Sequence, residues 1–160
     1  MTSPEYLFVY GTLCSASGGW MHHELARRAR LAGTGWIAGR LWDTGSYPAA
    51  IPAASPDERV HGELYKIAPD STAELLALLD RYEGYLPDAP GRSLFLRQRT
   101  RVTREDGEPV RAWVYVYNGT TDRLRRITSG DYLECYQGRD SPPPGAPGPP
   151  PTSPPRSPRS

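Results

Sequence analysis

Residues 6 to 13 read Tyr6-Leu7-Phe8-Val9-Tyr10-Gly11-Thr12-Leu13. The aromatic and branched run over residues 6–10 predicts a buried strand, because such side chains suit a covered pleated surface. Gly11 ends the strand, where a glycine can take a positive φ or let a ligand approach the backbone. The amides of Gly11, Thr12 and Leu13 can then point at one spot and hold a carboxylate or an oxyanion. Glycine turns after strands are common, so this stretch alone is weak evidence for an anion-binding site and has to be interpreted together with other motifs.

A second informative stretch is Leu79-Asp80-Arg81-Tyr82-Glu83-Gly84-Tyr85. It closes a helix predicted over residues 71–82, which begins with a Ser-x-x-Glu capping box and carries an apolar stripe of leucines. Glu83 follows that stripe between aromatic residues and a glycine. Apolar surroundings of this kind raise a carboxyl pKa and strengthen the carboxylate as a base. The alternative interpretation is a glutamate at a frayed helix end that pairs with Arg81 or Arg97.

Hydrophobic patterning and glycines predict the other elements. An amphipathic helix is expected over residues 20–30, with His22 and His23 on its surface or rim. Three glycines within residues 31–43 favour strongly bent strands, because each interior glycine would cost a helix about 1 kcal/mol. The Asp106-Gly107 pair predicts a hairpin turn between two strands. The predicted strands cover residues 47–51, 60–67, 94–104 and 110–118, and in the last of these Trp113, Tyr115 and Tyr117 share one face.

Strands separated by single helices and joined by a long hairpin predict an α+β domain. We expect a mixed sheet curled into a small β-barrel with helices packed outside. Hydrophobic residues make up 38% of the 160 residues, which is enough for one globular domain over residues 1–139.

Residues 140–160 are mostly Pro, Ser, Gly and Arg with no large apolar residue, so they cannot bury enough surface to offset ordering entropy. A disordered, partly polyproline II tail is expected there.

Charge and cysteine content argue against several classes of protein. The formal net charge of +1 gives no broad electrostatic attraction to nucleic acid or anionic lipid, and the arginine clusters at 27–30 and 123–126 are interpreted as solvated helix faces. No apolar segment approaches the about 20 residues that span a bilayer. The N-terminus lacks a signal-peptide pattern, and two cysteines are too few for a disulfide framework. We expect a cytoplasmic protein that binds neither nucleic acid nor membrane.

Metal, nucleotide and thiol chemistry have no support in the residue pattern. No cluster of His, Cys and Asp has metal-ligand spacing, and the single-glycine turn lacks the further glycines of a dinucleotide loop. Cys14 follows the turn, but neither His22 nor His23 has a visible third partner to complete a nucleophilic triad. We therefore expect no metal site and no cofactor.

The glycine turn and the Glu83 stretch belong to a longer ordered set of short motifs. The set contains Phe8-Val9-Tyr10-Gly11-Thr12-Leu13, Gly45-Ser46-Tyr47-Pro48-Ala49, Val60-His61-Gly62-Glu63-Leu64-Tyr65, Leu79-Asp80-Arg81-Tyr82-Glu83-Gly84-Tyr85, Arg97, Trp113-Val114-Tyr115-Val116-Tyr117 and Ser129-Gly130-Asp131-Tyr132. In this combination and order the motifs resemble the γ-glutamylcyclotransferase-like family, which includes AIG2-like and YtfP-like proteins. The resemblance covers about residues 5–136 and leaves only the proline-rich tail outside.

The resemblance implies a small mixed β-barrel whose cavity binds a γ-glutamyl group and releases it as 5-oxoproline without a cofactor. Glu83 matches the family's catalytic Glu. The chemistry needs such a base, because the substrate's α-amine must lose a proton before its nitrogen attacks the γ-carbonyl. The same group can then protonate the departing amine. The expected site for the α-carboxylate or the developing oxyanion is the backbone of Tyr10, Gly11, Thr12 and Leu13.

Tyrosines are the candidate walls of this cavity. Tyr47 and Tyr117 are the predicted substrate contacts and Tyr115 is a further candidate wall, although tyrosines on a strand face more often serve a core than a ligand. Arg97 is expected either to pair with a carboxylate or, as is more common for an arginine on a barrel strand, to brace a loop or a neighbouring acid.

Asp43 and Glu63 are the acidic rivals of Glu83, and Glu63 is expected to face solvent from its alternating strand. Three functions remain open. The first is a cyclising enzyme with Glu83 as general acid/base, and the second is a non-catalytic member of the same fold that binds a small metabolite or a protein. The third is an interaction module whose working part is the tail over residues 140–160.

Overall fold

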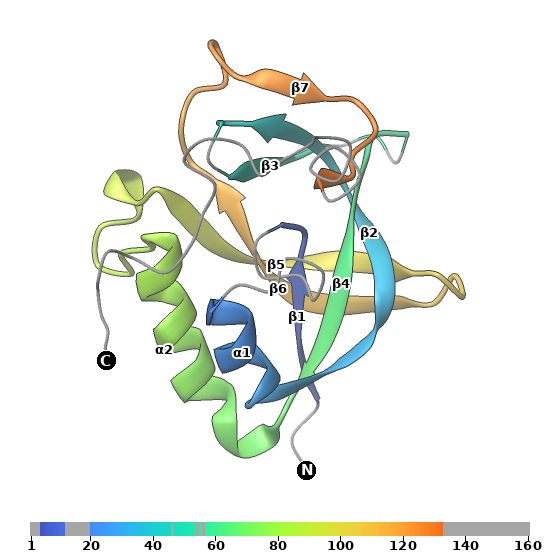
Figure 1. Cartoon of the computed structure of the whole chain (residues 1–160), viewed down its shortest axis with the longest axis vertical. Coiled ribbons are helices and arrows are strands. Elements are labelled where there is room, and N and C mark those ends of the chain that lie inside the picture. Colours follow the sequence, from blue (N-terminus) through green and yellow to red (C-terminus); the bar gives the residue numbers. More distant parts are fainter. Residues whose placement is uncertain (1–3, 12–19, 46, 54, 56, 133–160) are drawn as a thin grey trace.

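The computed structural model describes residues 4–11, 20–45, 47–53, 55 and 57–132. Within them, a closed five-stranded barrel carries two α-helices on its outside (Figure 1). One pair of neighbouring strands, β1 and β6, is parallel, while the barrel's other pairs are antiparallel. The α+β class and the small mixed barrel predicted from the sequence are therefore confirmed. Around the barrel, the strands are β2 (Ala29–Asp43), β4 (Arg59–Ile67), β1 (Glu5–Val9), β6 (Pro109–Tyr117) and β5 (Phe95–Arg104), which closes on β2.

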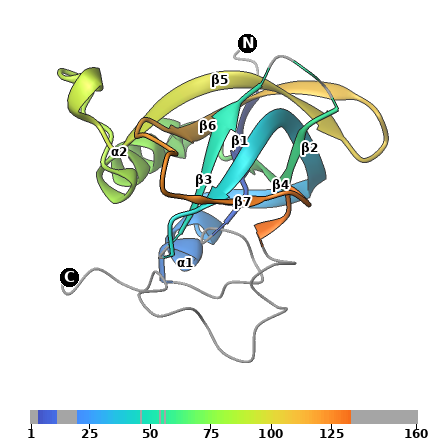
Figure 2. The same ribbon diagram turned by 90° about the horizontal axis from the view of Figure 1, so that it is seen from above.

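The long strand β2 closes the barrel and then extends beyond it. Residues 29–38 pair with β4, and part of that stretch also pairs with β5. The end of β2 instead pairs with two short strands, β3 (Pro48–Pro52) and β7 (Arg125–Ile127). The register with β4 shifts between Leu31 and Gly33, so the bend expected from the glycines is one bulged strand rather than several. Seen from above, β5 and β7 lie on opposite sides of the molecule (Figure 2).

Two hydrophobic clusters divide the core between the inside and the outside of the barrel. Alternation along β6 sends Ala112, Val114 and Val116 into the inner cluster. Its other face carries aromatic side chains into a second cluster, which lies between the barrel and the helices. The aromatic face predicted for residues 110–118 is therefore confirmed, and it is turned toward the helices.

The two helices cover this outer face and differ from their predicted bounds. α1 (Trp20–Ala26) ends before residue 30, because the chain from Ala29 onward pairs with β4. α2 (Thr72–Glu83) follows a 3₁₀ turn, η2 (Pro69–Ser71). The predicted capping box is absent, since Ser71 makes no side-chain cap hydrogen bond.

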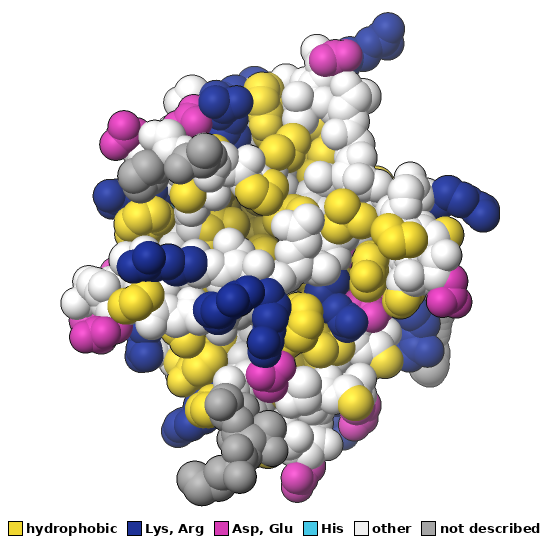
Figure 3. All heavy atoms as spheres, turned by 180° about the vertical axis from the view of Figure 1, so that it is seen from behind, with side chains coloured by type: hydrophobic (Ala, Val, Ile, Leu, Met, Phe, Trp, Pro, Cys, Tyr) yellow, Lys and Arg dark blue, Asp and Glu magenta, His cyan; other side chains and the backbone are white. Residues whose placement is uncertain are grey.

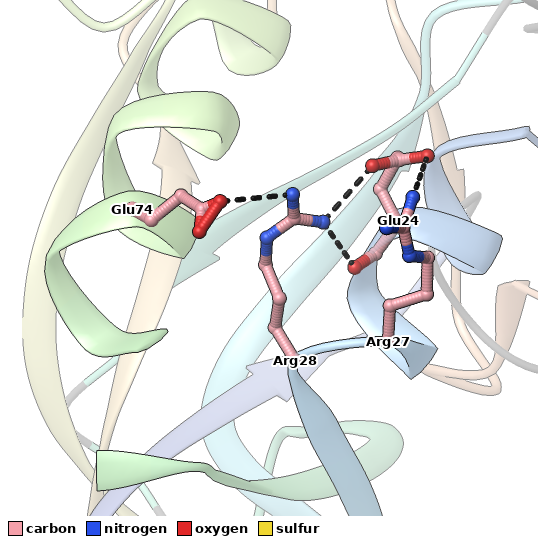
Figure 4. A network of polar contacts seen from close by, with 4 residues as sticks. All are labelled: Glu24, Arg27, Arg28 and Glu74. Carbon is pink, nitrogen blue, oxygen red and sulfur yellow. Dashed lines mark hydrogen bonds and ion pairs between the residues drawn. The ribbon is translucent and has the colours of Figure 1, made fainter. Parts of the chain in front are cut away.

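The glutamate of that expected box serves a different contact. Glu74 accepts a hydrogen bond from Arg28 at 3.0 Å, and Arg28 also bonds Glu24 at 2.9 Å (Figure 4). This cluster ties α1 to α2 across the outer face of the barrel. The side chain of Arg28 is only 14% exposed, so this part of the 27–30 cluster is not a solvated helix face.

The arginine cluster at 123–126 was also expected on a helix face, and this is wrong. Residues 125–127 form β7, in which Arg125 pairs with Asp43 and Arg126 pairs with Glu58.

Another short 3₁₀ turn, η3 (Pro90–Arg92), lies between α2 and β5. In the described ranges, no helix is long and apolar enough to cross a membrane. The tail expected over residues 140–160 lies outside the described residues.

Candidate active site

Glu83 is the last residue of α2, and the helix ends there for a backbone reason. Gly84 adopts the left-handed conformation with φ 72° and ψ 33°, which is strained for residues that carry a Cβ. The amide of Tyr85 then donates to the carbonyl of Asp80 at 2.8 Å, which closes the final turn. Glu83 therefore has a defined position, at the end of the helix and one residue beyond the predicted end.

The environment of Glu83 disfavours its charged form. Desolvation raises the pKa of its half-buried carboxyl from 4.5 to about 8. Its place at the negative end of the helix dipole acts in the same direction. Among the described residues it has no ion-pair partner, and Arg97 pairs with Asp80 at 3.1 Å instead. The interpretation of Glu83 as a partner of Arg97 is therefore wrong.

Three tyrosine hydroxyls lie within electrostatic reach of the Glu83 carboxylate. Burial raises the pKa of Tyr10 above its usual range, and the negative charge of Glu83 raises it further. Burial likewise raises the pKa of Tyr47 and of Tyr115, each with a smaller contribution from Glu83. Tyr10 follows β1, Tyr47 precedes β3 and Tyr115 lies in β6, so three separate strands bring these groups to the end of α2.

Hydrogen bonds fix the innermost of these tyrosines. The hydroxyl of Tyr10 donates to the carbonyl of Tyr115 at 2.6 Å and accepts from the amide of Ala50 at 3.4 Å. Tyr10 is 8% exposed, and the residue after it, Gly11, is also buried. Because the charge of Glu83 also acts on its hydroxyl, Tyr10 lies in the same region of the molecule as the end of α2.

Gly11 is required here by close packing rather than by a positive φ. Its φ is outside the left-handed region, but a Cβ built on it would collide with the ring of Pro48. The rigid proline therefore covers the turn at a distance that only glycine permits. Thr12 and Leu13, the other two residues of the predicted anion site, lie outside the described residues.

Tyr47 and Tyr117 form an aromatic wall with Phe95 between them. The ring centroid of Phe95 lies 5.7 Å from that of Tyr47 and 5.6 Å from that of Tyr117. Thr44 holds Tyr47 in place, because its hydroxyl donates to the Tyr47 carbonyl at 2.8 Å and accepts from the Tyr47 amide. Burial raises the pKa of Tyr47, and the neighbouring Tyr117 raises it further.

The two acidic rivals of Glu83 are engaged in other contacts. Asp43 is buried, accepts from the amide of Gly45 at 2.7 Å and pairs with Arg125 at 3.1 Å. Glu63 is half-buried rather than facing solvent, and it accepts a hydrogen bond from the Tyr65 hydroxyl at 2.9 Å. Glu83, by contrast, is desolvated and has no ion-pair partner among the described residues.

His22 and His23 lie in α1 and differ in their exposure. His22 packs its ring against that of Tyr65 at 6.1 Å, while His23 is exposed. Cys14 lies outside the described residues. Across the described ranges, no group of three or more His, Cys, Asp or Glu side chains is placed to hold a metal ion.

Comparison with known proteins identifies the family of this chain. The family model described as "Gamma-glutamyl cyclotransferase, AIG2-like" matches residues 7–134. The chain belongs to this family. The family protein YtfP of Escherichia coli K12 is 34% identical over 131 residues, which is 80% of this chain and 96% of that protein.

Solved structures of other AIG2-like proteins share the fold. The solution structure of E. coli YtfP, at 33% identity, superposes with a TM-score of 0.50 and covers 81% of this chain and 97% of that one. A mouse AIG2-like protein, at 22% identity, gives a TM-score of 0.57 over 82% of this chain and 89% of its own. The barrel is therefore the common frame of this AIG2-like chain and its relatives.

One residue of the AIG2-like site was not assigned a role by sequence reasoning. Asp80 accepts hydrogen bonds from Arg97 and, at 2.6 Å, from the hydroxyl of Tyr115. Arg97 thus braces a neighbouring acid, one of the two roles expected for it. The only signal in the sequence was the spacing of Asp80 and Glu83, which lie three residues apart and so share a helix face.

Proposed function

We propose that this protein is a γ-glutamylcyclotransferase, which closes the γ-glutamyl group of a γ-glutamyl amide into 5-oxoproline and releases an amine or amino acid. The observation that supports this most is the desolvated carboxyl of Glu83, which has no ion-pair partner among the described residues and whose charge reaches the hydroxyl of Tyr10. Membership of the AIG2-like family points to the same reaction class.

In the proposed reaction, Glu83 is the general base. A carboxyl whose pKa is about 8 removes a proton from an α-ammonium more readily than an ordinary glutamate does. The freed nitrogen attacks the γ-carbonyl carbon, a new C–N bond closes the five-membered ring, and the original amide C–N bond breaks. The two protons that the α-nitrogen loses are the two that the departing nitrogen gains when it leaves as an ammonium. Glu83 carries protons between these two nitrogens.

The remaining residues bind and orient the substrate. Negative charge develops on the γ-carbonyl oxygen, and the backbone amides from Gly11 to Leu13 are the proposed donors to this oxygen or to the α-carboxylate. Tyr47 and Tyr117 are the proposed walls around the glutamyl chain. Because both reacting atoms belong to one molecule, holding that molecule in its folded-back conformation supplies much of the rate enhancement.

The test is release of 5-oxoproline from a panel of γ-glutamyl amino acids and amines. We expect wild-type protein to be active on at least one of them and Glu83→Gln to be about 10²–10⁴-fold slower, which is the usual contribution of a general base. Glu63→Gln is the matched control, because it removes a half-buried glutamate that is hydrogen-bonded to Tyr65 instead.

Two results would contradict the proposal. Equal rates for wild type and Glu83→Gln would remove Glu83 from the role of base. Absence of 5-oxoproline with every substrate, combined with saturable binding of one of them, would instead identify a non-catalytic binding protein on the same fold.

A further inference from the structure

The Glu83 side chain makes no hydrogen bond or ion pair with a described residue, so its position depends on the backbone at the end of α2. That end is held by Asp80, one turn earlier. The carbonyl of Asp80 accepts from the Tyr85 amide at 2.8 Å, and its carboxylate contacts two neighbouring strands. Both the main chain and the side chain of Asp80 therefore stabilise the turn that carries Glu83.

The first strand contact of Asp80 is with β5. A guanidinium nitrogen of Arg97 lies 3.2 Å from Oδ1 and 3.1 Å from Oδ2 of Asp80. The side chain of Asp80 is only 13% exposed and that of Arg97 only 22%, which limits solvent screening of the pair. The guanidinium of Arg97 also lies 5.5 Å from the ring centroid of Tyr85, just beyond the helix end. Arg97 therefore neutralises Asp80 and touches the loop that follows Glu83.

The second strand contact runs into the site itself. The hydroxyl of Tyr115 donates to Oδ1 of Asp80 at 2.6 Å, while the carbonyl of Tyr115 accepts from the hydroxyl of Tyr10 at 2.6 Å. Tyr10 and Tyr115 are two of the tyrosines within reach of Glu83. One connected set of hydrogen bonds thus joins α2, β6 and the residue that follows β1, near the carboxylate of Glu83.

We propose that Asp80 is a positioning residue, which through Arg97 and Tyr115 holds the end of α2 against the barrel and so sets the place of the Glu83 carboxylate. This inference rests on the proposed function of Glu83 as base. Asp80 itself touches no reacting atom. If its anchoring is lost, the last turn of α2 is expected to move away from the barrel, water reaches Glu83, and its carboxyl becomes easier to ionise.

The test is the variant Asp80→Asn, which keeps the shape of the side chain and removes its charge. We expect kcat to fall about 10²-fold, as for a small displacement of a catalytic group, with KM changed less than kcat. The acid limb of the kcat/KM profile should move to lower pH. The same direction is expected for the midpoint of the Glu83 carboxyl resonance in a ¹³C NMR titration, assigned with Glu83→Gln. Tyr115→Phe removes one contact of Asp80 and should shift both midpoints in the same direction by less.

Glu74→Gln is the matched control, because it breaks an ion pair of the same helix at the other end (Figure 4). It should leave the rate and both midpoints unchanged. If Asp80→Asn does not fold, as judged by circular dichroism, Tyr115→Phe decides the question instead. Folded variants with the wild-type midpoints would overturn the inference. A shifted NMR midpoint in a protein that releases no 5-oxoproline would support the positioning role and refute the proposed reaction.

Discussion

At the scale of single residues, Glu83 is placed at a cost to the stability of the fold. In the unfolded chain a glutamate loses its proton near pH 4.5, whereas in the folded protein burial raises this pKa to about 8. Between these values the folded state holds the proton and the unfolded state does not. The free energy of unfolding must therefore decrease as pH rises through this range, and the full loss is present above about pH 8.

Glu83→Gln should remove this loss. Each unit of pKa shift corresponds to about 1.4 kcal/mol, so with partial solvent access we expect the variant to be about 1–3 kcal/mol more stable than wild type above pH 8. Below pH 4.5 the two proteins should unfold alike. Urea unfolding at both pH values, followed by tryptophan fluorescence, measures the difference. Glu105→Gln, at an exposed position, should show no such pH-dependent gain. A variant that is less stable than wild type above pH 8 would contradict the assigned environment.

Sequence reasoning predicted the apolar environment of the Glu83 carboxyl because the cues are local: a leucine stripe before it, and aromatic residues and a glycine beside it. Asp80 could not be assigned in this way. Its two strand partners lie 17 and 35 residues along the chain, and nothing near Asp80 indicates which strands will pass beside it. Gly11 was identified for an incomplete reason, since its close neighbour Pro48 is also far along the chain.

At the scale of elements, the end of α2 is the junction on which the site depends. Gly84 permits the left-handed turn, and its carbonyl accepts from the amide of Leu94, just before β5. The same glycine therefore ends the helix and directs the chain toward the next strand.

Gly84→Ala should destabilise the protein by about 1–2 kcal/mol, because a Cβ in the left-handed region is strained. The new Cβ would also lie 3.2 Å from that of Leu94. The free energy of unfolding in urea measures the effect. Gly91→Ala is the control, since Gly91 has no positive φ and a Cβ there meets nothing within 4 Å. Equal losses for both variants would show that glycine content, rather than the turn, is responsible.

The elements that sequence patterning misjudged are those set by pairing partners. Residues 27–30 continue a helical pattern, yet Ala29 starts a strand because Ile67 of β4 is available to pair with it. Residues 125–127 are too short and too polar to signal a strand, and they become β7 only because the end of β2 has a free edge. Long periodic segments such as α2 were predicted to within one residue at each end.

At the scale of the whole molecule, a net charge of +1 hides an uneven distribution. Seen from behind, dark-blue Lys and Arg side chains gather across the centre of one face (Figure 3). Arg99 and Arg101 are two residues apart on β5 and so share one face of the strand, and Arg101 lies opposite Arg111 of β6. Arg99 pairs with Glu5 at 2.6 Å and lies over the ring of Trp113, so its own charge is partly neutralised.

For the proline-rich segment at residues 140–160 we predict that it is dispensable for the fold and for the proposed activity. Its composition offers no large apolar side chain to bury. Deleting it should leave the melting temperature and the rate of 5-oxoproline release unchanged, as measured by calorimetry and by the release assay. A lower melting temperature would show that these residues pack on the barrel. Loss of a cellular phenotype with both values intact would favour the interaction-module hypothesis.

The closure of the barrel by β2 and β5 determines when the site can exist during folding. Gly35 of β2 pairs with Arg104 of β5, and β5 must also pair with β6 before the barrel is complete. Contacts between such distant segments form slowly, because the chain loses the entropy of loop closure before the new contacts stabilise it. A growing chain that has been synthesised only to residue 83 already contains its proposed base, but not Tyr115. In a refolding experiment, turnover should therefore return in a single late phase, together with the pairing of the last barrel strands.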